Sequence, residues 1–168
     1  LPVYFKNSLE VLKKINFFLK KYNPSKTRIW IKPHPTMNKK IVKKITKNLS
    51  KNCEIVTGDV ITSLSKANIL IGSMTSTCLE AMGLGIPVIV LEQPYGLFGL
   101  LTIPKEIPQN YWKYCTSAED MSDAINYFKR KTGNFKDIRN YIRENYFEQV
   151  TKKSISNFLD PNYAEKQL

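Results

Sequence analysis

The chain has 168 residues, of which 42% are hydrophobic and 24% are charged, and this composition indicates one globular domain rather than a disordered or fibrous chain. Its apolar runs stay well below the roughly 18 residues that a membrane-spanning helix requires. The formal net charge is +12, which favours phosphate-bearing partners such as nucleotides, anionic lipids or nucleic acid. A lysine-rich composition that only coats the surface explains the same charge.

The cysteines and the chain start bear on compartment and completeness. Cys53, Cys78 and Cys115 are far apart, with neither a CxxC pair nor a neighbouring histidine, so we expect neither a disulfide framework nor a zinc site. This usage favours a reducing cytoplasm. We find no paired-aspartate metal motif, and we expect no bound metal or cofactor. The start, Leu1-Pro2, has neither an initiator methionine nor a signal pattern, so we expect a piece of a longer protein.

Helices and strands are predicted to alternate in the first half of the chain. Apolar residues recur every three or four positions over 7–22, which predicts a helix that ends before Pro24. A strand is predicted at 27–32, and a lysine-rich amphipathic helix at 38–50, whose charges fit a solvated face. A short strand follows at 54–57, Asp59 caps a helix that reaches residue 66, and residues 68–72 form another apolar strand.

The second half continues the alternation. A helix is predicted at 76–84, a turn at Gly85, and a strongly apolar strand at 88–91. Residues 92–109 contain prolines and glycines, which predict a long loop. An edge strand is expected at 111–115, followed by a helix that Thr116 and Ser117 cap. Helical patterning then continues to residue 159, with a break at 132–134.

The arrangement of these elements predicts the fold class. Short apolar strands without alternation are buried on both faces, and strands that alternate with helices form parallel sheets. We therefore predict an α/β fold: a single Rossmann-like domain over residues 1–168, with a doubly wound parallel sheet of about five strands and helices on both faces. In such folds ligands bind at the carboxyl ends of the strands, where the loop 92–109 begins.

The segment 69–81 is the strongest local signal. A buried strand leads into a turn and a helix start that together carry hydroxyl groups at Ser73, Thr75, Ser76 and Thr77. Backbone N–H groups at a helix start and nearby hydroxyls suit phosphate oxygens, so a pyrophosphate would bind there. The alternative is local: Thr77 and Glu80 have the spacing of a capping box, which explains two residues but not the whole cluster.

The single histidine, His34, follows the strand predicted at 27–32 and lies between Pro33 and Pro35. Flanking prolines remove backbone donors and keep the segment out of a helix or a central strand. We expect His34 at the carboxyl edge of the sheet, where its imidazole would contact the same phosphates. The alternative is a rigid turn in which the histidine only has a structural role.

Three motifs in this order resemble a known family. Pro33-His34-Pro35 after one strand, a Ser/Thr-rich turn that leads to Glu80-Ala81, and Gly85-Ile86-Pro87-Val88-Ile89 before another strand are similar to the C-terminal domain of GT-B glycosyltransferases. The likeness is greatest to enzymes of bacterial surface polysaccharide, capsule and teichoic acid biosynthesis. It covers about residues 28–95.

The resemblance implies a metal-independent transferase with a nucleotide-activated donor, linked to UDP, CMP or CDP. His34 and the four hydroxyls of the turn would contact the donor phosphates, and His34 would stabilise charge on the departing phosphate. Glu80 would hold the ribose, Thr57 and Gly58 would face the base, and Glu92 would lie along the sugar or glycerol. The N-terminal half, which would hold a saccharide or lipid-linked acceptor, is absent, so the fragment alone would bind a donor without reacting. Its place would be the cytoplasm, peripheral on the inner membrane face.

The sequence departs from the family at one point and leaves two rivals open. No motif matches the basic residue that many members place on the phosphates, although Lys32 is a possible stand-in. A non-hydrolysing sugar-nucleotide 2-epimerase is similar but resembles Ser-Gly-Gly at the turn, where this chain has Ser73-Met74-Thr75. A binding module with a basic surface is the other rival. An anionic membrane suits it better than nucleic acid, because only four of the 26 basic residues are arginine.

Overall fold

The computed structural model describes residues 3–22, 27–34, 37, 40, 42–43, 52–73, 75–92, 103–131 and 135–147. Helices and strands alternate along most of this part of the chain, as the sequence predicts. The elements in chain order are α1 (Val3–Tyr22), β1 (Ile29–Ile31), β2 (Cys53–Ile55), α3 (Val60–Leu64), β3 (Leu70–Gly72), α4 (Thr77–Gly83), β4 (Val88–Leu91), β5 (Trp112–Cys115), α5 (Ala118–Arg130) and α6 (Lys136–Tyr146).

The strands are parallel and form two sheets in the described residues. One sheet pairs β1 with β2, and the other has the order β3-β4-β5. The expectation of an α/β fold with parallel strands is confirmed, whereas the described strands form two sheets instead of the single sheet expected. β1, β2 and β3 are only three residues long, so each offers few backbone groups for a ladder that would join the sheets.

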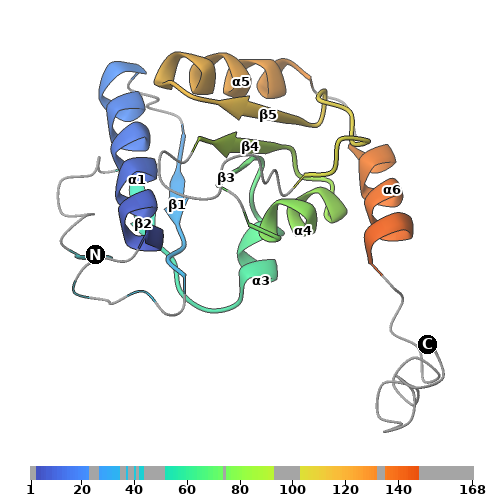
Figure 1. The fold of residues 1–168 in the computed structure, drawn as a ribbon, viewed down its shortest axis with the longest axis horizontal. Coiled ribbons are helices and arrows are strands. Elements are labelled where there is room, and N and C mark those ends of the chain that lie inside the picture. The colour runs from blue at the N-terminus through green and yellow to red at the C-terminus, as the bar shows by residue number, and fades with distance from the viewer. Residues whose placement is uncertain are drawn as a thin grey trace, which may run out of the picture.

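Both faces of the three-stranded sheet are covered by helices. Side chains alternate across a strand, and β4 shows this: Val88 and Val90 join one buried cluster with residues of α3, α4 and α6. Ile89 and Leu91 join a second cluster with residues of α1 and α5. Figure 1 shows α5 along β5 on one side of this sheet, with α3 and α4 on the other.

The two-stranded sheet shares this core. Ile29 of β1 and Cys53 of β2 pack against the second cluster, as does Ile71 of β3. Phe135, which precedes α6, packs against both clusters. The two sheets and the helices therefore belong to one packed unit.

Most predicted element boundaries agree with the structure. Asp59 caps α3 by accepting a hydrogen bond from the Thr62 N–H at 2.6 Å. Ser117 and Asp120 form a capping box at the start of α5, and Gly85 turns the chain after α4 with a φ of 79°, which favours glycine. α1 begins at Val3, before the predicted start at residue 7, because no proline or glycine interrupts residues 3–7.

One expectation about burial is wrong. All four residues of β4 are buried, but Glu54 and Ile55 of β2 are exposed. β2 pairs with β1 alone among the described strands, so one of its sides has no described neighbour to cover it. The loop segment 93–102, the break at 132–134 and the helical pattern beyond residue 147 lie outside the described residues. So does most of the lysine-rich helix, of which Lys40, Val42 and Lys43 are described as helical.

Candidate functional site

The candidate site is built from residues that follow the carboxyl ends of the strands. Within each sheet these ends lie at one edge, because Ile31 is opposite Ile55 and Gly72 is opposite Val90. The strands therefore place the predicted contact residues at these edges. They are His34 after β1, Thr57 and Gly58 after β2, Ser73, Thr75, Ser76, Thr77 and Glu80 from β3 into α4, and Glu92 after β4.

The hydroxyl groups between β3 and α4 are held close to one another. The Thr75 hydroxyl donates to Thr77 Oγ1 at 3.3 Å and accepts from the Thr77 N–H at 3.4 Å. The Cys78 thiol, which is fully buried, donates to the Ser73 carbonyl at 3.4 Å. This thiol ties the turn to the first turn of α4 and limits how far the hydroxyls can move apart.

The alternative for this segment, a capping box between Thr77 and Glu80, is not formed. α4 begins at Thr77, so the cap position is Ser76 and not Thr77. Ser76 has helical dihedral angles, φ −56° and ψ −25°, and its side chain makes no capping hydrogen bond. A capping residue normally has extended angles. The exposed Ser76 hydroxyl is therefore not used to cap the helix.

His34 lies three residues beyond the end of β1, with an exposed side chain. Its backbone carbonyl accepts a hydrogen bond from the Met37 N–H at 2.9 Å. This hydrogen bond restrains the backbone beside His34 and leaves the side chain exposed. A structural role for His34 and contact with a phosphate are therefore both compatible with the structure.

The end of β2 is linked to the end of β1 through a lysine. The Lys32 ammonium donates to the Gly58 carbonyl, and Gly58 has a φ of 90°. The pKa of Asp59 is lowered, mainly because its carboxylate accepts the Thr62 N–H. Lys32, the stand-in cation of the sequence analysis, therefore lies at this edge beside the residues expected to face the base.

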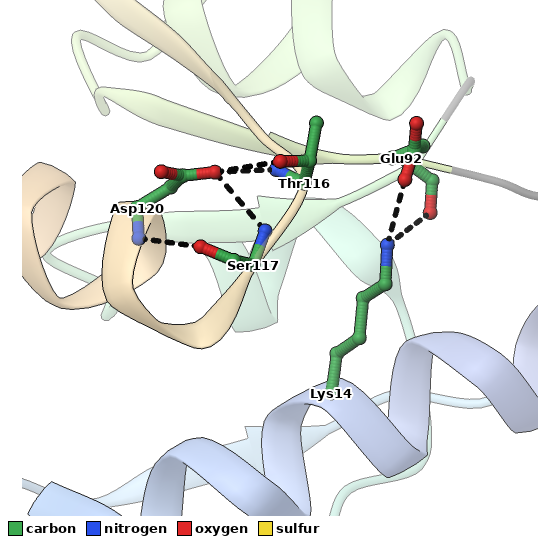
Figure 2. A network of polar contacts seen from close by, with 5 residues as sticks. All are labelled: Lys14, Glu92, Thr116, Ser117 and Asp120. Carbon is green, nitrogen blue, oxygen red and sulfur yellow. Dashed lines mark hydrogen bonds and ion pairs between the residues drawn. The ribbon is translucent and has the colours of Figure 1, made fainter.

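Glu92 has a partner that the sequence analysis missed. The Lys14 ammonium, from the middle of α1, donates to the Glu92 carboxylate at 3.2 Å and to its backbone carbonyl at 3.3 Å (Figure 2). Lys14 lies on the inward stripe of α1 between Val11 and Ile15, where an apolar residue is expected. That interruption of the stripe is the sequence signal that could have pointed to it.

A second polar group lies beyond Glu92, at the end of β5 (Figure 2). The Asp120 carboxylate accepts from the N–H of Thr116 at 2.9 Å, from its hydroxyl at 2.8 Å, and from the N–H of Ser117 at 3.0 Å. These donors lower the pKa of Asp120 to about 2. The pKa of Tyr114, on β5, is raised by burial and then by the charge of Glu92.

The structure brings some predicted residues together and leaves others apart. It joins Lys32 to Gly58 and holds Thr75 beside Thr77. His34 and Gly58 belong to the β1-β2 sheet, whereas the hydroxyl turn and Glu92 belong to the β3-β4-β5 sheet. Strand pairing therefore does not hold these two groups of residues at a common edge.

Metal ligands and thiols give no second site in the described residues. No group of three or more His, Cys, Asp or Glu side chains is arranged to hold a metal ion in that part of the chain. Burial raises the pKa of the Cys115 thiol to about 11 and that of Cys53 as well, so both thiols are protonated at neutral pH. None of the helices described is long and apolar enough to cross a membrane.

Comparison of the chain with protein-family models, with curated proteins and with solved structures gave no match. The site is therefore interpreted from its own geometry and chemistry.

Proposed function

We propose that the chain is the donor-binding half of a GT-B glycosyltransferase that acts in bacterial surface polysaccharide biosynthesis. The observation that supports this most is that each predicted donor contact follows the carboxyl end of a parallel strand. Parallel α/β proteins bind nucleotides at this edge. The donor would be a nucleotide-linked sugar or polyol.

The proposal includes a finer view of the fold. The shared core at Ile29, Cys53 and Ile71 is compatible with one continuous sheet, and if β1 is the strand beside β3 the order is β2-β1-β3-β4-β5. The chain then extends in opposite directions on either side of the β1/β3 junction. Such a junction is a topological switch point, and ligands bind in the crevice outside it. His34 and the hydroxyl turn would flank that crevice.

The residues would divide the work as follows. The hydroxyls of Ser76 and Thr77 would donate to the phosphate oxygens, and the Lys32 ammonium would add positive charge. The Thr75 hydroxyl would join them by turning away from Thr77 Oγ1. His34 would stabilise the charge that develops on the departing phosphate. Removal of one contact that acts mainly in the transition state costs on the order of 2 to 4 kcal/mol in the complete enzyme.

The proposed donor site is tested by titrating the 168-residue chain with UDP, CMP, CDP and GDP, by calorimetry or amide NMR shifts. One nucleotide should bind with millimolar affinity or tighter. His34→Ala and Ser76→Ala should each weaken it about tenfold, because a hydrogen bond to a charged group contributes about 1.5 kcal/mol.

Ser65→Ala is the matched control. Ser65 is an exposed serine at the end of α3, and its hydroxyl donates to the Thr62 carbonyl at 2.9 Å. Its loss should leave nucleotide affinity unchanged. If the folded chain binds none of the four nucleotides, or if Ser65→Ala weakens binding as much as Ser76→Ala, the donor-site assignment is wrong.

A further inference from the structure

Positive and aromatic side chains gather where α5 ends and β5 begins. The ring of Tyr127 is at the centre: the Lys113 ammonium is 4.5 Å from its centroid and the Lys131 ammonium 5.7 Å. Lys129 and Arg130 are the exposed neighbours on α5. We call these five residues, Lys113, Tyr127, Lys129, Arg130 and Lys131, the basic face.

No ion pair between described residues joins a cation of the basic face to a carboxylate. The three lysine–glutamate pairs among the described residues all involve α1 instead. Lys129 donates to the hydroxyl of Thr27 and Lys131 to the carbonyl of Asn110, both at 3.4 Å, and both acceptors are neutral. The basic face places three cations at the end of α5 and one, Lys113, on β5. Like charges repel one another, and a negatively charged partner would relieve that repulsion.

The shape and the aromatic content indicate what kind of anion fits. A depression of about 470 Å³ is lined by Asp123, Asn126, Tyr127, Arg130 and Lys131. The cations come from both α5 and β5 rather than converging on an enclosed cavity, so they suit an extended charged surface. Tyr127 remains 37% exposed, and an amphipathic ring of this kind is favoured at the level of lipid headgroups.

A second exposed ring lies in the same helical layer. Phe17 of α1 is 55% exposed, and the Lys21 ammonium is 5.9 Å from its centroid. α1 and α5 pack together over the same buried cluster. Lys21 pairs with Glu119 in the first turn of α5, however, so this ring lies at the other end of α5 and is not part of the basic face.

We propose that the basic face docks on a membrane surface that carries anionic phosphate headgroups. Docking at the basic face does not depend on the proposed donor site. The 13 residues of α5 span about 20 Å at 1.5 Å per residue, and α5 starts at the carboxyl edge and ends at the basic face. A membrane bound there would leave the opposite edge free for a donor.

The test is co-sedimentation of the 168-residue chain with phosphatidylcholine vesicles, with and without phosphatidylglycerol. The chain should bind only the anionic vesicles, and added salt should weaken the binding. The double variant Lys129→Gln, Arg130→Gln should bind about 25-fold more weakly, because each charge near an anionic surface contributes about a fivefold factor.

The matched control is Lys66→Gln, Lys136→Gln, which removes the same charge from exposed lysines beside α3 and α6, on the other helical layer. It should lose little binding, and circular dichroism should show both variants folded. The proposal is overturned by equal losses in the two variants, by a parent chain that ignores anionic vesicles, or by tighter binding to single-stranded RNA. Soluble glycerol phosphate that shifts the amide signals of 129–131 when vesicles do not bind would overturn it in favour of a small phosphate ligand.

Discussion

Lys14 and Glu92 show how much of the candidate site depends on single side chains. They are 78 positions apart in the chain, and they are joined by two hydrogen bonds from one ammonium group. Lys14 retains 22% of its side-chain exposure and Glu92 42%, so the pair is only partly shielded from water. It connects the N-terminal helix to the carboxyl end of the most buried strand.

We predict that Lys14→Met lowers the free energy of unfolding by about 1 kcal/mol, the upper end for a partly exposed ion pair. Methionine keeps the apolar stem, so the loss reports the ammonium contacts. Urea denaturation measures it. Lys13→Met is the neighbouring control, because Lys13 is 70% exposed in its pair with Glu10 at 2.7 Å. Its effect should stay within about 0.5 kcal/mol, and equal effects would contradict the prediction.

The turn between β3 and α4 shows which local details the sequence pattern leaves undecided. The hydroxyl cluster was visible in the sequence, but whether it forms a capping box depends on the residue at which α4 begins. A shift of one residue decides it, since a start at Thr77 makes Ser76 the cap position. Such boundaries depend on packing around Cys78 and Ala81, which are fully buried.

At the scale of the element, α5 is the helix whose ends are most clearly specified. Ser117 and Asp120 form the capping box at its start, and Lys129 and Arg130 lie in its last turn. Acidic groups at the start and basic groups at the end both complement the helix dipole. The sequence predicts this start correctly because the cap signal is local.

The cap of α5 leads to a prediction about acid stability. The pKa of Asp120 falls from 3.8 to about 2 on folding, so its contribution is complete above pH 4 and is lost as the pH falls towards 2. Asp120→Asn should therefore be less stable than the parent at pH 5, and the difference should shrink below pH 4. Urea denaturation across this range measures it. A difference that is constant with pH would contradict the assignment.

At the scale of the whole molecule, two hydrophobic clusters cover the two faces of the β3-β4-β5 sheet. They meet at β4, which supplies residues to both, and at Phe135, which packs against both. A domain of this size with connected cores is expected to unfold as one cooperative unit.

We predict that Ile142→Ala, which empties a fully buried position of α6, lowers the free energy of unfolding by about 2 to 5 kcal/mol. Because the clusters are connected, tryptophan fluorescence and far-ultraviolet circular dichroism should report one transition at the same shifted midpoint. Asn140→Ala, at an exposed position of the same helix, should leave the midpoint nearly unchanged. Two separate transitions would show that the faces unfold independently.

What the sequence determined by itself was local. Hydrophobic periodicity, together with turn and capping residues, indicates which segments become helices or strands. β4, α4 and the cap of α5 were predicted in this way, because each depends on neighbours in the chain. The tertiary structure alone decided the division into two sheets, the exposure of β2 and the pairing of Lys14 with Glu92. These features depend on contacts between segments far apart in sequence, and no local pattern contains the relative positions of such segments.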